Sequence, residues 1–179
     1  MDMPTATEKL IARKEGAIGW IIFNNPEKRN AMSLEMSEAT AVAMEGYAKD
    51  PAVRVVILKG EGDKAFVSGA DISQFKERRS NMEQVRAAEV ISERTNKAIR
   101  ECPKPTIAMI RGYCMGGGLG IAVACDLRIA ADDSRFGVPA AKLGVGYRFV
   151  GIRRLAEIVG PQFTAEIFYT GRQFSAQEA

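Results

Sequence analysis

The sequence predicts a mixed α/β fold in which parallel strands are joined by crossover helices. Short β-branched runs alternate with longer stretches of helical periodicity, and each of two strand–strand–helix cycles ends at a turn of small residues. The length of 179 residues suits one domain. The hydrophobic share of 46% and the charged share of 26% are ordinary for a globular protein. We therefore expect a single domain over residues 1–179.

The first elements are a hairpin and a helix. Leu10–Lys14 and Ala17–Phe23 are apolar, β-prone runs joined at Glu15-Gly16, which predicts the hairpin. Ser33 is a typical helix N-cap, and apolar side chains at helical spacing follow it as far as the Asp50-Pro51 stop.

The middle of the chain predicts two strands and a long helix. Val53–Lys59 and Ala65–Val67 are the strands, and the second runs directly into small residues at positions 68–70. The helix covers Met82–Glu101. The side chains expected on its packed face are Val85, Ala88, Ile91, Thr95 and Ala98.

The last part repeats this order. Thr106–Arg111 is a buried-type strand, Gly112–Gly118 is a glycine-rich turn, Leu119–Ala124 is a short apolar helix and Asp126–Ala131 is another strand. Two further helices are expected at Ile152–Val159 and Pro161–Tyr169.

Composition excludes several classes of function. The chain contains no histidine, which removes a Ser-His-Asp triad, an imidazole base and any histidine-based metal site. It has neither a dinucleotide-binding glycine motif nor a P-loop. A net charge of +3, with acids between the basic residues, argues against a nucleic-acid partner. No apolar run reaches the roughly 20 residues of a membrane helix, so we expect no membrane partner.

The three cysteines, Cys102, Cys114 and Cys125, form no Cys-x-x-Cys pair. Their odd number favours reduced, buried thiols over a disulfide framework. A cytoplasmic location is therefore expected.

Two segments place small residues just after a strand. One is Ala65-Phe66-Val67-Ser68-Gly69-Ala70-Asp71-Ile72, and the other is Ile110-Arg111-Gly112-Tyr113-Cys114-Met115-Gly116-Gly117-Gly118-Leu119. Small residues let a ligand approach the main chain, and N–H groups at a helix start are free donors. If the turns face each other they form an oxyanion hole, in which one donor is worth about 2.7–4 kcal/mol.

These segments and others follow one another in a known order. The motifs are Asn25-Pro26-Glu27-Lys28-Arg29-Asn30-Ala31, Phe66-Val67-Ser68-Gly69-Ala70-Asp71-Ile72, Gly112-Tyr113-Cys114-Met115-Gly116-Gly117-Gly118, Ala124-Cys125-Asp126-Leu127-Arg128-Ile129-Ala130, Phe136-Gly137-Val138-Pro139 and Lys142-Leu143-Gly144. Together they resemble the crotonase superfamily, the enoyl-CoA hydratase/isomerase family. The resemblance implies a ClpP/crotonase-like fold of repeated strand–strand–helix units, here a single acyl-CoA-binding domain over residues 1–179.

The resemblance also implies a site. The N–H groups of Ala70 and Gly117 would stabilise the enolate of an acyl-CoA thioester, as expected of a lyase or isomerase of fatty acid metabolism. Coenzyme A would enter as part of the substrate, with no tightly bound cofactor and no metal. The residues implied to contact the CoA thioester are Lys28, Ala31, Ser68, Ala70, Asp71, Ile72, Met115, Gly116, Gly117 and Pro139. Asp71 is also a candidate cap for a helix beginning near Ile72.

Family members continue with further helices that close the site and build a homotrimer or a dimer of trimers. This chain stops at Gln177-Glu178-Ala179, in what resembles the start of such a helix. We therefore expect these C-terminal helices to be missing and the domain to be incomplete.

The chain departs from the family at both of its water-activating glutamates. Gly120 and Ala140 stand where the resemblance places them. Neither side chain can transfer a proton, and a positioned acid or base contributes about 10²–10⁴-fold. Ordinary hydration should therefore be weak, and a catalytically silent acyl-CoA-binding subunit is one alternative.

Tyr147 supports another alternative. The stretch from Pro139 to Tyr147, with Val150-Gly151-Ile152 after it, resembles part of methylmalonyl-CoA decarboxylase, where a tyrosine binds the departing carboxylate. Decarboxylation of a malonyl-type thioester needs the oxyanion hole but no base. Arg148 is expected to be an exposed surface arginine, or else to pair with a substrate carboxylate.

Overall fold

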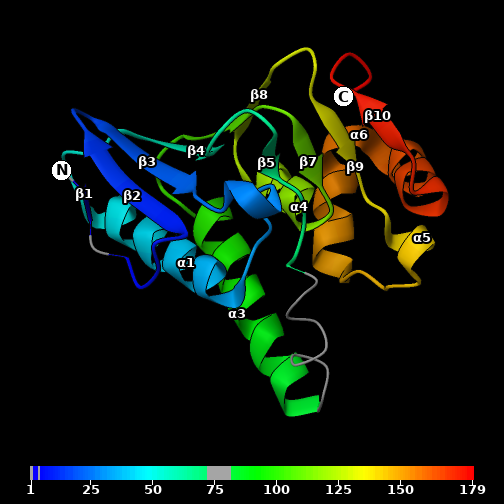
Figure 1. The fold of residues 1–179 in the computed structure, drawn as a ribbon, viewed down its shortest axis with the longest axis horizontal. Coiled ribbons are helices and arrows are strands. Elements are labelled where there is room, and N and C mark those ends of the chain that lie inside the picture. Colours follow the sequence, from blue (N-terminus) through cyan, green and yellow to red (C-terminus); the bar gives the residue numbers. More distant parts are fainter. Residues whose placement is uncertain (1, 4, 72–81) are drawn as a thin grey trace.

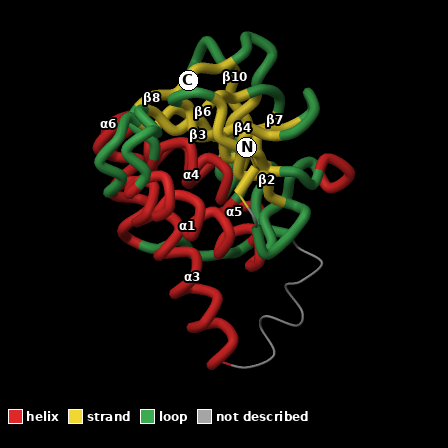
Figure 2. The backbone as a smooth tube through the Cα atoms, turned by 90° about the vertical axis from the view of Figure 1, so that its left-hand side faces the viewer, coloured by secondary structure: helices red, strands yellow, loops and turns green. Residues whose placement is uncertain are grey.

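The computed structural model describes residues 2–3, 5–71 and 82–179. It shows two β-sheets with the helices gathered beside them, and α3 projecting from the rest of the molecule (Figures 1 and 2). The mixed α/β class expected from the sequence is confirmed, with parallel pairing in both sheets.

The larger sheet has six strands in the order β1-β2-β3-β4-β6-β8. The strands are β1 (Asp2–Met3), β2 (Leu10–Glu15), β3 (Ile18–Phe23), β4 (Val55–Gly60), β6 (Thr106–Ile110) and β8 (Leu127–Ala130). The predicted hairpin is β2–β3, with Gly16 at φ 56° in its turn. From β3 to β8 all pairs are parallel.

The smaller sheet has four strands in the order β10-β9-β7-β5. The strands are β5 (Ala65–Val67), β7 (Tyr113–Met115), β9 (Arg135–Gly137) and β10 (Gln173–Ser175). β5 has its predicted bounds, whereas β7 lies inside the segment predicted as a glycine-rich turn. Strands β9 and β10 were not predicted from the sequence, because such short strands depend on pairing with segments that are distant in the sequence.

The helices connect and flank these sheets. They are the 3₁₀ helix Pro26–Lys28, α1 (Leu34–Lys49), α3 (Met82–Arg100), α4 (Gly117–Ala124), α5 (Ala140–Leu143) and α6 (Phe149–Thr170). The two helices predicted near the C-terminus are parts of α6, which is kinked at Gly160 (φ 81°) just before Pro161. Proline cannot complete the helical hydrogen bonding there, so the break falls where the sequence predicted it.

Helix α1 begins as predicted at Ser33, whose side chain accepts a hydrogen bond from the Met36 N–H at 3.1 Å. Its partner is α3, and a two-bond ion pair from Arg94 to Glu45 joins them at 2.9 and 2.8 Å. Buried Thr95 adds a hydroxyl hydrogen bond to the Ser37 carbonyl. These contacts fix the α1–α3 pair beside the core.

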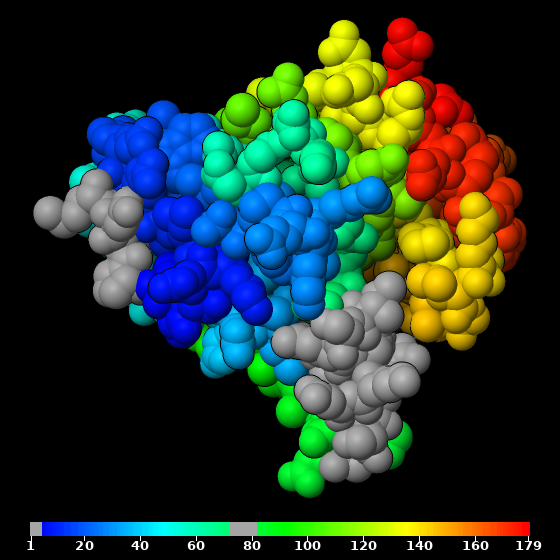
Figure 3. Space-filling model, in the orientation of Figure 1, coloured from blue at the N-terminus to red at the C-terminus, as the bar shows by residue number. Residues whose placement is uncertain are grey.

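The core links the two sheets. Phe23 at the end of β3 and Phe66 in β5 pack edge to face at a centroid distance of 5.5 Å, and both are fully buried. Figure 3 shows the N-terminal hairpin in blue and the C-terminal segment in red on opposite sides of the molecule. Within the described residues, none of the helices is long and apolar enough to cross a membrane.

Candidate active site

The two turns of small residues lie against each other. A Cβ built on Gly69, in the turn after β5, would be 3.6 Å from the Met115 carbonyl oxygen, and one on Gly116 would be 3.9 Å from the Gly69 Cα. Gly69 and Gly116 have φ values of 118° and 52°, a region that favours glycine. The backbone itself therefore forms the contact, and the two turns meet, which was the condition for an oxyanion hole.

This arrangement leaves one N–H group in each turn without a protein acceptor among the described residues. Gly116 donates its N–H to the Gly137 carbonyl at 2.8 Å, whereas Gly117 is the first residue of α4. Ala70 pairs with Met32 through the flanking Gly69 carbonyl and Asp71 N–H. Within the described part of the chain, the N–H groups of Ala70 and Gly117 donate to no protein acceptor, and both residues are exposed.

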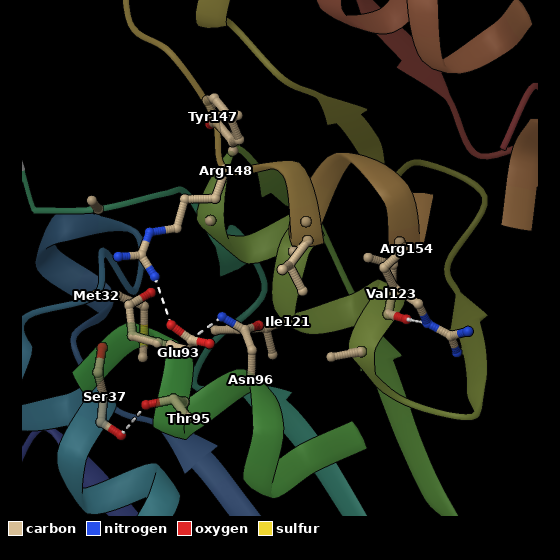
Figure 4. A pocket seen from close by; sticks show the side chains of 18 of the residues that line it. Met32, Ser37, Glu93, Thr95, Asn96, Ile121, Val123, Tyr147, Arg148 and Arg154 are labelled. Atoms are coloured by element: carbon tan, nitrogen blue, oxygen red, sulfur yellow. Dashed lines mark hydrogen bonds and ion pairs between the residues drawn. The ribbon is translucent and has the colours of Figure 1, made fainter. Parts of the chain in front are cut away.

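Both residues line a cavity of about 390 Å³, a volume typical of small-molecule sites. Residues of α1, α3, α4 and the start of α6 surround it (Figure 4). The lining residues include Ser37, Ala70, Ala88, Ser92, Glu93, Asn96, Arg100, Gly116, Gly117, Gly120, Ile121, Tyr147, Arg148 and Arg154.

Arg148, at the start of α6, reaches across the cavity to α3. Its guanidinium lies 2.9 Å from Glu93 (Figure 4) and 2.6 Å from Glu89. These hydrogen bonds, that to Glu89 most strongly, raise the pKa of Arg148. Arg148 is thus half-exposed, as expected, but its charge is already paired with two protein carboxylates rather than left for a substrate.

Comparison with known proteins identifies the family. The sequence profile described as enoyl-CoA hydratase/isomerase matches residues 13–179, which is most of the chain. The chain belongs to the enoyl-CoA hydratase/isomerase family. The crotonase resemblance and the crotonase fold expected from the motifs are confirmed.

Individual members of the family agree with this assignment. The crotonyl-CoA hydratase of Syntrophomonas wolfei is 36% identical over 174 residues, covering 97% of this chain and 66% of that protein. The short-chain-enoyl-CoA hydratase of Clostridium acetobutylicum is 34% identical, covering 95% of this chain and 64% of the relative. The crystal structure of an enoyl-CoA hydratase/carnithine racemase from Magnetospirillum magneticum superposes with a TM-score of 0.93 at 38% identity, covering 97% of this chain and 65% of that one. The chain therefore spans a little under two thirds of the length of these relatives.

Gly120 and Ala140, the two positions at which the resemblance led us to expect glutamates, differ in their surroundings. Gly120 lines the cavity, and a Cβ built there meets nothing within 4 Å, so the space for a longer side chain is open. Ala140, the first residue of α5, is buried and is not among the described residues that line the cavity. A carboxylate would thus be accommodated at position 120 far more readily than at position 140.

Tyr147 lies in the cavity beside the glycine turn. Its hydroxyl is 3.1 Å from the position that a Cβ on Gly116 would take. The ring packs edge to face on Phe168 at 5.2 Å, and burial raises the pKa of the phenol. The neutral hydroxyl is therefore held next to Gly116, the residue that directly precedes Gly117.

The residues expected to contact CoA form a second cluster, joined to the cavity through Ala70. Lys28 donates to the buried Asp71 carboxylate at 3.0 Å, and the Ser68 hydroxyl donates to the Lys28 carbonyl at 3.3 Å. Ala31 is buried and donates its N–H to the same carbonyl. Ile72, and the helix that Asp71 was expected to cap, lie outside the described residues.

Of the other residues expected at the site, some line the cavity and some do not. Gly116 lines the cavity with Ala70 and Gly117, whereas Met115 and Pro139 are partly exposed beside it. Met115 ends β7, and Pro139 is the N-cap of α5. Neither is among the described lining residues.

The sequence reading missed the contribution of α3. Its cavity face carries a residue at every fourth position: Ala88, Ser92, Asn96 and Arg100. Ala88 was already expected on the packed face of the helix, whereas Ser92, Asn96 and Arg100 form a polar row that was not predicted to line a site, although residues four apart share a helix face. The apolar stripe through Ile91 and Thr95 predicts which face of the helix packs, but it does not predict which polar residues border a cavity.

The cysteines and acids add no second centre. Burial raises the pKa of the Cys114 thiol strongly and that of Cys125 to about 12, which makes both inert as nucleophiles. Across the ranges that the structure describes, no group of three or more histidine, cysteine or acidic side chains is placed to hold a metal ion.

Proposed function

We propose that this chain binds an acyl-CoA thioester and stabilises its enolate through the N–H groups of Ala70 and Gly117. The observation that carries the proposal is the contact between the two turns, which leaves these two donors unengaged at one cavity. Membership of the enoyl-CoA hydratase/isomerase family supports the same substrate class.

The chemistry of the donors fits a thioester oxygen. Gly117 begins α4, so its N–H lies at the positive end of a helix of 8 residues. A carbonyl oxygen that becomes an oxyanion gains most from donors that are already oriented. Both donors are held by packed backbone, which favours the enolate over the neutral thioester.

For the CoA moiety we propose the cluster of Lys28, Ala31, Ser68 and Asp71, together with Ile72, Met115, Gly116 and Pro139. The ammonium of Lys28 is about half-exposed even while paired with Asp71. It can therefore approach a phosphate without leaving its partner. Coenzyme A would act as part of the substrate.

The reaction class proposed is that of a lyase or isomerase of fatty acid metabolism. Hydration finds support in the relatives named crotonyl-CoA hydratase and short-chain-enoyl-CoA hydratase. Gly120 and Ala140 argue against the family's usual water activation. Isomerisation needs no activated water, but it needs a proton-transferring group other than Gly120 and Ala140.

Decarboxylation of a malonyl-type thioester is the second candidate, and the position of Tyr147 favours it. A neutral phenol beside Gly116 can donate a hydrogen bond to a substrate carboxylate near the enolate site. Loss of carbon dioxide then leaves the enolate to the same two N–H groups.

The deciding experiment is mass spectrometry of a panel of enoyl-CoA and malonyl-type CoA thioesters after incubation with the protein and with Tyr147→Phe. Gain of water or a shifted double bond supports the first candidate. Loss of carbon dioxide that is reduced in Tyr147→Phe supports the second. Tight thioester binding without turnover identifies a silent subunit, and absence of binding by the folded protein overturns the proposal.

We also propose a cytoplasmic protein that, if the full-length chain continues with the family's C-terminal helices, assembles as a homotrimer or a dimer of trimers. The resemblance to the family motivates both expectations. Light scattering of the purified protein measures its assembly, and a monomeric mass would contradict it.

A further inference from the structure

Glu93 places a carboxylate in the cavity from an unexpected element. It lies on α3, beside the polar face formed by Ser92 and Asn96 (Figure 4). Among the described residues that line the cavity, it is the only acid. Its side chain is 63% exposed, so the carboxylate is accessible to a bound molecule.

Arg148 holds this carboxylate by one oxygen only. Its Nη1 donates to Glu93 Oε2 at 2.9 Å, while its Nη2 lies 2.6 Å from Glu89 Oε2. Within the described residues, Glu93 Oε1 has no hydrogen-bond partner. One oxygen is therefore anchored, and the other remains available to take a proton.

The proposed enolate chemistry requires a proton-transferring side chain in this cavity. Formation of an enolate from an acyl thioester requires a base that removes a proton from Cα, unless carbon dioxide leaves instead. Gly120 and Ala140 cannot serve as that base. Glu93 lines the same cavity as Gly120, in the helix that packs against α4.

We propose that Glu93 is the proton-transferring carboxylate of this site. Oε1 takes the proton as the Cα–H bond breaks, and the electron pair of that bond forms the double bond between Cα and the thioester carbon. The carbonyl electron pair moves to the oxygen, which the N–H groups of Ala70 and Gly117 hold. The proton on the exposed Glu93 carboxyl exchanges with solvent, and transfer of a solvent-derived proton back to Cα restores the carboxylate. This step rests on the proposed function.

The test measures exchange of the Cα hydrogens of butyryl-CoA with deuterium oxide by NMR, and binding of butyryl-CoA by calorimetry. Glu93→Gln should lose exchange by about 10²-fold or more while binding is retained. Glu89→Gln is the matched control, because Glu89 also pairs with Arg148 but is not a described lining residue. It should keep most of the exchange. Glu93→Asp retains a carboxylate and should keep part of it.

The possible results distinguish a failure of the Glu93 role from a failure of the proposed function. If the unaltered protein binds and exchanges butyryl-CoA but Glu93→Gln exchanges equally fast, Glu93 has no such role and the proposed function stands. If Glu89→Gln loses as much as Glu93→Gln, the ion pairs are structural and the inference is overturned. If the unaltered protein neither binds nor exchanges the thioester, the proposed function fails first.

Discussion

Gly118 in α4 packs directly on the backbone of Val67 at the end of β5. A Cβ on Gly118 would lie 2.2 Å from the Val67 carbonyl oxygen and 2.8 Å from the Val67 Cβ. Both Val67 atoms belong to the packed core, so neither can move away without a loss of folding stability. This contact sets the first turn, which follows Val67, against the second, which precedes Gly118.

Gly118→Ala should therefore destabilise the fold. Overpacking of this kind costs about 1–3 kcal/mol, and for 150–250 residues each kcal/mol lowers Tm by roughly 2–4 °C. Thermal unfolding followed by circular dichroism measures the change. Gly120→Ala is the control in the same helix, because its Cβ would meet nothing within 4 Å. Equal Tm values for the two variants would show that the Val67 contact is not tight.

Gly117→Pro should remove one of the two proposed oxyanion donors without removing the helix. Proline lacks the N–H and is tolerated at the first position of a helix, which Gly117 occupies in α4. Loss of one such donor typically lowers kcat by about 10²–10³-fold. Steady-state kinetics on whichever thioester the panel identifies would measure it.

Gly117→Ala separates the donor from the size of the residue. It keeps the N–H and adds a methyl group where nothing lies within 4 Å. An alanine variant as slow as the proline variant would mean that steric exclusion of substrate, and not the lost donor, explains the effect.

The sequence predicts the long elements of this fold well, because their signals are local. Ser33 marks the start of α1 by its side-chain oxygen, and Pro161 marks the kink in α6 by its missing N–H. β7 was read as part of a turn because its strand character depends on pairing with β5 and β9, which are distant in sequence. Tertiary context decides such short strands.

The candidate site likewise combines features with local sequence signals and contacts that depend on tertiary packing. Turns of small residues after strands are visible in the sequence, and the resemblance to the family implies Ala70 and Gly117 as the donors within them. The Arg148–Glu93 pair joins residues 55 positions apart and requires α3 to pack beside α6's start, which no local pattern specifies. Long-range pairs of ordinary charged residues are where reading the sequence alone falls short.

Alkaline pH should destabilise the protein through its buried thiols. Burial raises the pKa of Cys125 to about 12 in the folded state, whereas an exposed thiol ionises near pH 8.5. The unfolded chain therefore releases the proton first. The stabilising contribution is complete below about pH 8.5 and is lost as pH rises toward the folded pKa, at up to about 1.4 kcal/mol per pH unit for each thiol.

Urea unfolding between about pH 7 and pH 10 tests this dependence. Cys125→Ala should show a shallower loss of stability with pH than the unaltered protein, since one buried thiol is removed. Cys102→Ala is the control, because Cys102 is only partly buried. Parallel pH curves for all three proteins would show that thiol ionisation does not drive the loss.

Gly120→Glu should increase enoyl-CoA hydration. The resemblance to the family places a water-activating glutamate at this position, and the space beside Gly120 is open within the cavity. Glutamate is also a better helix former than glycine, so α4 should not be weakened. Because a positioned acid or base contributes about 10²–10⁴-fold, we expect hydration of crotonyl-CoA to rise by about 10²-fold, measured by loss of enoyl absorbance.

The control is Gly120→Gln, whose side chain has nearly the same shape as glutamate but cannot transfer a proton, and it should show no rise in hydration. If both variants accelerate hydration equally, filling the cavity rather than proton transfer is responsible. If neither does, the absence of the second glutamate at Ala140 is sufficient by itself to prevent water activation.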